Sequence, residues 1–175
     1  MAHIMKYHKL LWIVFALFFS ACDKQAEKLF WISKNTNQRS DFLLLTESAN
    51  VAPLRIDSLK LFLKTDELKH FDSASATFKN LGQIYRSDKF RVFVLLHSID
   101  THGRDYHFII RTIDYDWNVI DDFELGRWNE AEHNYCYGSI DSDLIIERKC
   151  DTKDTPDIRQ ITGEGKIIMT SFHKP

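Results

Sequence analysis

The sequence lacks several features that would point directly to a class of function. Its leading apolar run, Leu10 to Ala21, has twelve residues, whereas a helix that crosses a bilayer needs about 20. No block of basic residues occurs, so nucleic acid is not an expected partner. The patterns G-x-S-x-G, H-E-x-x-H and C-x-x-C are all absent. The absence of these motifs argues against the enzyme classes that they identify. We expect neither a cofactor nor a bound metal.

The apolar run has the length of a different element, the centre of a secretory signal peptide, which spans about 7–15 residues. Lys6 and Lys9 give it a basic start. The stretch Phe19-Ser20-Ala21-Cys22 that follows resembles the lipobox of bacterial lipoproteins, with Phe in place of the usual Leu. The resemblance implies that residues 1–21 are removed and that Cys22 is lipidated. An ordinary signal peptide and a short buried helix are the alternatives.

This resemblance also implies a location. Two or more acyl chains on Cys22 would anchor the chain stably to a bilayer, on the periplasmic face of the bacterial cell envelope. An acidic residue after the cysteine, here Asp23, resembles the signal for retention in the inner membrane and slightly favours that membrane. Residues 22–41 are mostly polar and are expected to form a tether, with Leu29 to Ile32 as a candidate first strand.

One domain is expected after removal of the leader, since 154 residues remain. The mature chain has 21 basic and 25 acidic residues, a net charge of −4. Cys136 and Cys150 are its remaining thiols, and in an oxidising compartment we expect them to form a disulfide. Two free buried thiols are the alternative.

The hydrophobic pattern predicts a mainly β fold over residues 42–175. Phe42 to Thr46 is expected to be a buried strand, Leu59 to Lys64 is ambiguous, and Thr65 resembles a helix N-cap, so one or two short helices are expected in 42–80. Beyond these, short polar turns separate strands at spacings typical of an antiparallel meander. The predicted strands are 81–86, 90–99, 105–114, 118–126, 134–139, 144–149 and 165–172.

The central hairpin indicates how these strands are covered. If Asp100 faces Asp105, both faces of the hairpin are largely apolar, whereas a sheet with one wet face alternates cleanly. We therefore expect residues 42–80 to cover one face, and a second sheet or a barrel closure to cover the other. The expected architecture is a β-sandwich or a partly closed barrel.

Histidines and acidic turns are the candidate ligands for a metal. In the register above, His97 and His107 point to opposite faces and His102 lies in the turn, which argues against a shared ion. The turn starting at Asp114 opens like a calcium loop, but Val119 and Leu125 occupy the positions that need Gly and Glu. Oxygen-rich turns can still bind calcium weakly.

Catalytic candidates are few. Acidic residues around Trp128 could serve sugar hydrolysis, or they could simply be a solvated loop; they are Asp121, Asp122, Glu124, Glu130 and Glu132. Cys136 or Cys150 could pair with His133, although a disulfide would remove the thiolate. Ser171-Phe-His-Lys174 matches S-x-x-K, but it lies at the extreme C-terminus.

The stretch from Gly126 to Tyr135 is predicted to be a long loop and a binding site. Its Arg127, Trp128 and Tyr135 belong to the residue types that dominate binding hot spots, although Trp128 could instead plug one end of a barrel. We expect a non-catalytic module that binds another periplasmic protein. Small anchored β-domains of this kind resemble immunity lipoproteins, which neutralise toxins, and envelope-assembly accessories. A carrier of an apolar ligand and a cell-wall hydrolase are the alternatives.

Overall fold

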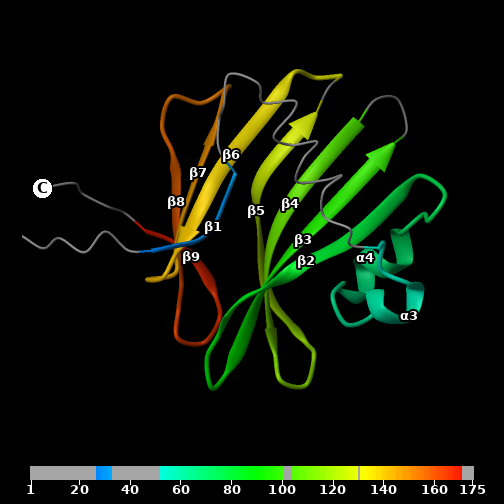
Figure 1. Cartoon of the computed structure of the whole chain (residues 1–175), viewed down its shortest axis with the longest axis horizontal. Coiled ribbons are helices and arrows are strands. Elements are labelled where there is room, and N and C mark those ends of the chain that lie inside the picture. Colours follow the sequence, from blue (N-terminus) through cyan, green and yellow to red (C-terminus); the bar gives the residue numbers. More distant parts are fainter. Residues whose placement is uncertain (1–26, 33–51, 101–103, 130, 171–175) are drawn as a thin grey trace, which may run out of the picture.

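Long antiparallel strands account for most of the described chain. The computed structural model describes residues 27–32, 52–100, 104–129 and 131–170 (Figure 1). The predicted fold class, mainly β with two short helices before residue 80, is confirmed. Neither helix has the length or the apolar character needed to cross a bilayer. The elements are β1 (Lys28–Ile32), α3 (Ile56–Leu59), α4 (Thr65–His70), β2 (Ala76–Arg86), β3 (Phe90–Asp100), β4 (Arg104–Asp114), β5 (Val119–Asn129), β6 (Asn134–Asp141), β7 (Ile145–Cys150), β8 (Asp157–Ile161) and β9 (Ile167–Met169).

The strands from β2 to β9 lie side by side in sequence order, and their pairings are antiparallel. The sheet stays open, with β2 and β9 at its ends, and does not close into a barrel. Figure 1 shows that it divides into two wings, β2–β5 and β6–β9 with β1. The β8–β9 turn docks onto the first wing, where the Thr112 hydroxyl donates to the Gly165 carbonyl at 2.7 Å. The wings therefore face each other as the layers of a sandwich do.

The main core lies between these wings. Because side chains alternate across a strand, every second residue of β3 and β4 points inward. The second wing supplies the opposing layer from β6 and β7. The fully buried members of this core are Phe90, Val92, Val94, Leu96, Phe108, Ile110, Leu125, Ile140 and Ile146.

Strand β1 fills the gap where β5 and β6 separate. These two strands pair only over Arg127–Asn129 and Asn134–Cys136, and β1 pairs with the remainder of β6. Ile32 of β1 is 3% exposed and belongs to the core. A Cβ added at Gly126 would lie 2.6 Å from its Cδ1 atom, so a larger residue at position 126 would require the Ile32 side chain to shift. The candidate strand at 29–32 is confirmed, and the predicted tether thus contributes a strand to the sheet.

The segment before β2 covers the outer face of the first wing. Phe62 packs edge-on against Phe93 at 5.3 Å between ring centroids, and Leu59 lies with Phe78 in a second small cluster. Arg111, fully buried in this layer, donates to the Phe62 carbonyl and forms a two-pronged ion pair with Glu67 at 2.8 and 2.9 Å. The prediction that residues 42–80 cover one apolar face is confirmed for their described part.

The predicted register of the β3–β4 hairpin is wrong by one residue. Asp100 pairs with Arg104, so His97 pairs with His107 and not with Phe108. A one-residue shift exchanges the two faces of a strand. Both faces of this hairpin are apolar, so the hydrophobic pattern could not fix the register.

The predicted strand bounds agree well between residues 81 and 150, and four differences from the prediction stand out. β2 begins earlier, at Ala76, and β5 continues to Asn129. β8 (Asp157–Ile161) was not predicted, because it is short and mostly polar. The helix expected at Thr65 is α4, but its N-cap is Lys64. The strand expected over 42–46 lies outside the described residues.

Candidate binding surface

The three residues predicted to bind a partner come close together, but they lie on paired strands and not in a long loop. Arg127 and Trp128 lie in β5 and Tyr135 lies in β6, so residues 126–135 are largely paired strand. Trp128 and Tyr135 are cross-strand partners with ring centroids 4.5 Å apart. Trp128 is 8% exposed and belongs to the main core. Little of its ring is therefore available to a partner.

Arg127 is engaged by its own chain. Its Nε and Nη2 atoms donate to the two carboxylate oxygens of Asp105 at 3.2 and 2.8 Å, the two-pronged geometry that arginine favours. The hydrogen bond with Asp105 raises the pKa of Arg127 against the opposing effect of burial. Burial alone would raise the pKa of Asp105, but the hydrogen bond from Arg127 and the charges of His107 and Arg127 together lower that pKa. This pair ties β5 to β4.

The two histidines that were predicted to point to opposite faces are direct neighbours. The rings of His97 and His107 lie 5.7 Å apart on the outer face of the first wing. Burial, reinforced by the charge of His107, lowers the pKa of His97 to about 4. Burial also opposes protonation of His107, but its hydrogen bond with Glu124 and the charge of Asp105 raise its pKa. The pKa values of these two neighbouring imidazoles are therefore shifted in opposite directions.

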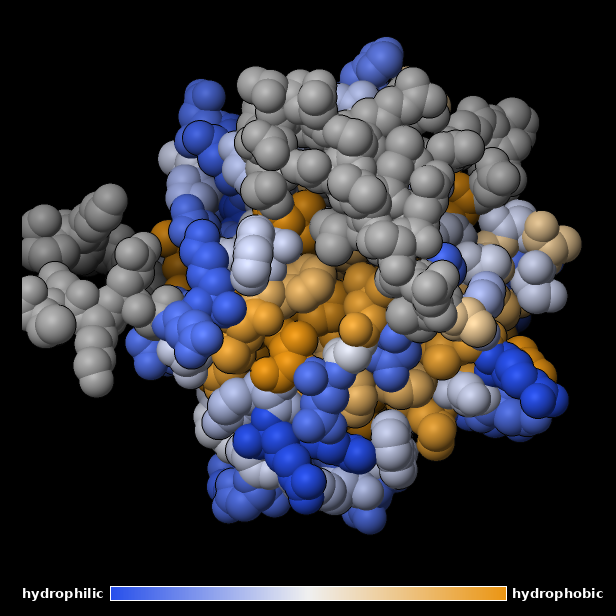
Figure 2. Space-filling view, viewed as in Figure 1, coloured by the Kyte–Doolittle hydropathy of each residue, from blue (hydrophilic) through white to orange (hydrophobic). Residues whose placement is uncertain are grey.

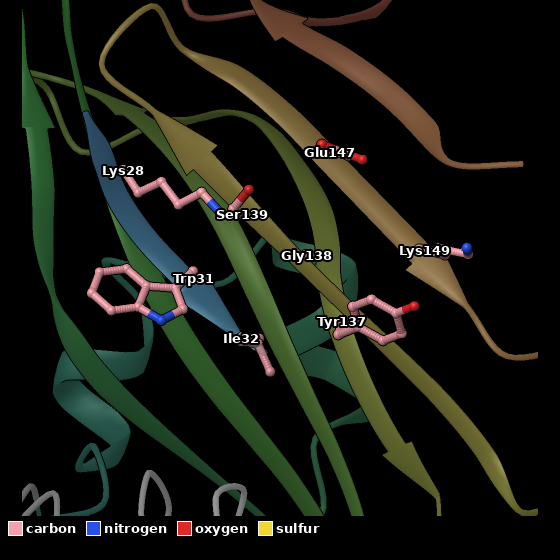
Figure 3. Close-up of a pocket in the computed structure, with 8 residues that line it drawn as sticks. All are labelled: Lys28, Trp31, Ile32, Tyr137, Gly138, Ser139, Glu147 and Lys149. Carbon is pink, nitrogen blue, oxygen red and sulfur yellow. The ribbon is translucent and has the colours of Figure 1, made fainter. Parts of the chain in front are cut away.

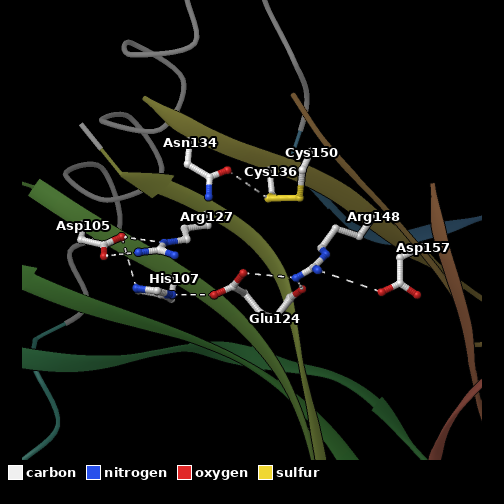
Figure 4. The surroundings of a disulfide bond; sticks show 9 residues. All are labelled: Asp105, His107, Glu124, Arg127, Asn134, Cys136, Arg148, Cys150 and Asp157. Carbon is white, nitrogen blue, oxygen red and sulfur yellow. Dashed lines mark hydrogen bonds and ion pairs between the residues drawn. A yellow bond between two sulfur atoms is a disulfide. The ribbon is translucent and has the colours of Figure 1, made fainter. Parts of the chain in front are cut away.

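A chain of polar side chains runs from His107 across the strands (Figure 4). His107 Nδ1 lies 2.6 Å from the Glu124 carboxylate. Arg148 Nη1 donates to the same carboxylate at 3.2 Å, and its Nη2 lies 4.0 Å from Asp157. The chain connects β4, β5, β7 and β8, and so ties the two wings together through charge-paired groups.

The predicted disulfide between Cys136 and Cys150 is present. The two residues are cross-strand partners on β6 and β7, with Cα atoms 4.0 Å apart. Neither sulfur is a thiolate in this state, so neither can form the nucleophilic pair with His133 considered from the sequence. The bond fixes β6 to β7 beside the polar chain (Figure 4).

The acidic residues considered for sugar hydrolysis are engaged within the chain. Asp121 accepts backbone N–H groups of Asp122 and Ile167, both at 2.9 Å. Asp122 is paired with Lys64, Glu124 belongs to the polar chain, and Glu132 lies 3.6 Å from Arg127. Glu130 and His102 lie outside the described residues.

Metal ligands do not converge within the described ranges. No group of three or more His, Cys, Asp or Glu side chains there is arranged to hold an ion. At the calcium-like turn, Asp114 accepts from the backbone and side-chain amides of Asn118 at 2.7 and 2.9 Å. The side-chain bond from Asn118 lowers the pKa of Asp114. This carboxylate therefore closes the turn.

That same turn displays a surface that was not predicted. Tyr115 and Trp117 are 40% and 37% exposed. The Arg91 guanidinium lies 3.9 Å above the Trp117 ring, a distance at which cation and π face attract. Arg86 Nε donates to the Tyr115 hydroxyl at 3.0 Å. We call these four residues, Arg86, Arg91, Tyr115 and Trp117, the aromatic–arginine surface.

The side chains of the aromatic–arginine surface are held in place by contacts within the chain. Trp117 rests on Phe62 and Phe93, at 5.9 and 6.2 Å between ring centroids. Its φ of 66° is a left-handed conformation that bulky residues rarely adopt and that is concentrated at functional positions. Arg91 is fixed from below by its bond to the Asp114 carbonyl at 2.7 Å. Such preorganisation lowers the entropy cost of binding.

A partial signal for the aromatic–arginine surface is present in the sequence. Trp117 lies between Asp116 and Asn118, and turns rich in Asp and Asn lie at the surface, so its exposure follows from its neighbours. The contribution of Arg86 and Arg91 had no such signal, because it depends on how β2, β3 and the β4–β5 turn meet in space.

Comparison with known proteins assigns this open, two-winged antiparallel fold to no family. No protein-family model, no curated protein and no solved structure matches the chain.

Proposed function

We propose that the chain is a lipoprotein anchored through Cys22 at the periplasmic face of the bacterial envelope, where it binds another protein without catalysis of its own. The leader and the lipobox-like stretch Phe19–Cys22 support the location, and Asp23 favours the inner membrane. The sheet provides a rigid scaffold from which turns can recognise a partner.

The observation that carries the proposal is the aromatic–arginine surface. Tryptophan, tyrosine and arginine dominate the energetics of protein–protein interfaces. Here one tryptophan, one tyrosine and two arginines are presented together, and Trp117 and Tyr115 remain more than a third exposed. We therefore place the interface at this turn instead of at Arg127, Trp128 and Tyr135, where the arginine is paired internally and the tryptophan is buried.

Site-specific photo-crosslinking in the native bacterium tests this proposal. With the reactive group at position 117, we expect one dominant protein adduct, and we expect Arg91→Ala to reduce its yield by about tenfold, as loss of a hot-spot residue does. The exposed position Lys153 is the control for random collision. Equal adducts from positions 117 and 153 would count against the surface.

The identity of the crosslinked protein separates the two finer versions of the proposal. If the chain is an immunity protein, the crosslinked protein will be a toxin that enters the periplasm. Cells carrying Trp117→Ala would then become sensitive to that toxin. If the chain is an envelope-assembly accessory, the crosslinked protein will be a resident envelope protein. The same variant would then weaken the permeability barrier of the envelope.

A carrier of an apolar ligand is the second candidate, and one observation favours it. Figure 2 shows a band of apolar side chains across the middle of one face, bordered by hydrophilic ones. Residues from both wings contact the main core while staying partly exposed, among them Phe30, Tyr85 and Tyr106. Mass spectrometry of an organic extract of the purified protein would detect a stoichiometric lipid if the wings hold one.

A further inference from the structure

The outer face of β1, β6 and β7 contains a pocket that the proposed partner interface does not use. Its volume is about 330 Å³. Figure 3 shows that Lys28 and Trp31 come from β1, Tyr137 and Ser139 from β6, and Glu147 and Lys149 from β7. It lies on the second wing, whereas α3 and α4 lie beside the first (Figure 1).

The side chains of this pocket have the composition of a membrane–water interface. Trp31 is 57% exposed, and tryptophan and tyrosine concentrate at the headgroup level of bilayers, where their rings are apolar and their polar atoms stay hydrated. The exposed Lys28 and Lys149 supply two ammonium groups against the single carboxylate of Glu147. Lysine near a bilayer extends its ammonium to lipid phosphates while its stem stays in the apolar region.

The position of the pocket in the chain brings it to a membrane. Five residues separate Cys22 from Lys28, and even a fully extended stretch of that length spans only about 20 Å. A lipid on Cys22 would therefore hold β1 within a short distance of the headgroups. This short distance gives β1 a high effective concentration at the headgroups, so that a weak surface contact becomes persistent.

We propose that the face of β1, β6 and β7 around Trp31 docks on the phospholipid bilayer that holds the lipid anchor, with Trp31 among the headgroups and Lys28 and Lys149 against their phosphates. This inference rests on the proposed lipidation of Cys22. The docked face holds the second wing at the bilayer and leaves the aromatic–arginine surface of the first wing available to a partner.

Fluorescence quenching in vesicles tests the docking with the full chain as the bacterium processes it. The purified protein is reconstituted into vesicles of phosphatidylethanolamine and phosphatidylglycerol whose acyl chains carry bromine close to the headgroups. We expect bromine to quench the tryptophan fluorescence of the wild type and Trp31→Phe to lose the greater part of that quenching. Trp117→Phe is the matched control and should retain it.

Charge reversal provides the second arm. Lys28→Glu combined with Lys149→Glu should reduce the quenching, while the same reversal at the exposed Lys60 and Lys69 of the helical layer should leave it unchanged. Equal quenching of the wild type and Trp31→Phe, in protein that floats with the vesicles, would overturn the docking alone. Protein that does not float with the vesicles would overturn the lipid anchor and the docking together.

Discussion

At the scale of single residues, Arg111 is the largest of the fully buried side chains, and it is charged. Its charge is balanced by Glu67, which also accepts the Lys64 backbone N–H at 2.7 Å and so caps α4. Removing one partner of a buried pair leaves the other charge without compensation, which costs about 3–5 kcal/mol. Asp122, 3.9 Å from Arg111, offsets part of this loss.

We therefore predict that Glu67→Ala lowers the free energy of unfolding by about 3 kcal/mol, and that Glu67→Gln, which keeps hydrogen-bonding oxygen, lowers it by less. Urea denaturation measures both values. Glu164→Ala removes the exposed partner of Lys89 and is the control, with little expected effect. Equal stabilities of Glu67→Ala and Glu164→Ala would show that the buried pair is not needed.

The two adjacent histidines, His97 and His107, are expected to make the stability of the fold depend on pH in opposite directions. The pKa of His97 is about 4 in the folded state and about 6.5 when unfolded, so acidification through this window favours the unfolded chain, which binds the extra proton. The raised pKa of His107 stabilises the fold below its unfolded value, and this contribution is lost as pH rises through the folded pKa.

We expect His97→Gln to reduce the loss of stability between about pH 6.5 and 4, and His107→Gln to reduce the loss on the alkaline side. Unfolding free energies measured from pH 4 to 9 report both slopes. His70→Gln, at an exposed position of α4, is the control. If His97→Gln leaves the acid limb as steep as in the wild type, the neutral buried state assigned to His97 is wrong.

At the scale of elements, the helical layer offers a comparison between near neighbours. Leu59 is 2% exposed and packs on the sheet, while Leu61 is 37% exposed. We predict that Leu59→Ala costs about 2–4 kcal/mol through lost burial and a residual cavity, and that Leu61→Ala costs less than about 1 kcal/mol. Thermal unfolding compares the two variants. Similar losses would mean that the segment does not cover the sheet as described.

The disulfide makes a separate prediction for β6 and β7. The two cysteines are 14 residues apart, and closing a loop of about 15 residues stabilises a fold by about 3 kcal/mol on the chain-entropy model. Reductant should therefore lower the stability of the wild type towards that of the double variant Cys136→Ala/Cys150→Ala. The double variant should not respond to reductant, which provides the internal control.

The elements also show what the sequence could and could not predict. Strand positions between residues 81 and 150 followed from apolar runs and polar turns, and the cover on both faces followed from the two apolar faces of the hairpin. The register of the β3–β4 hairpin could not be predicted, because both of its faces are apolar and the hydrophobic pattern fits either register. The loop predicted around Trp128 was wrong for a related reason: the charged residues around it have the composition of a loop, but their partners Asp105 and Arg148 lie on other strands.

At the scale of the whole molecule, the two wings carry surfaces of different character. The first displays the aromatic–arginine surface beside the helical layer, and the second displays the Trp31 pocket. The polar chain and the β8–β9 turn hold the wings in a fixed relation, so the proposed bilayer contact and the proposed protein contact would lie on different wings. The two wings exist because β5 and β6 separate over most of their length, and β1 pairs with β6 in the gap between them.

The last prediction tests that split through two adjacent residues of β1. Ile32 is 3% exposed and contacts the core beside Gly126, whereas Trp31 is 57% exposed on the pocket side. Ile32→Ala should lower the free energy of unfolding by about 2–4 kcal/mol, and Trp31→Ala should change it by less than about 0.5 kcal/mol. Chemical denaturation of the two variants measures this difference directly. A small effect of Ile32→Ala would mean that β1 rests on a sheet complete without it, and a large effect of Trp31→Ala would mean that the exposed tryptophan serves the fold and not the membrane.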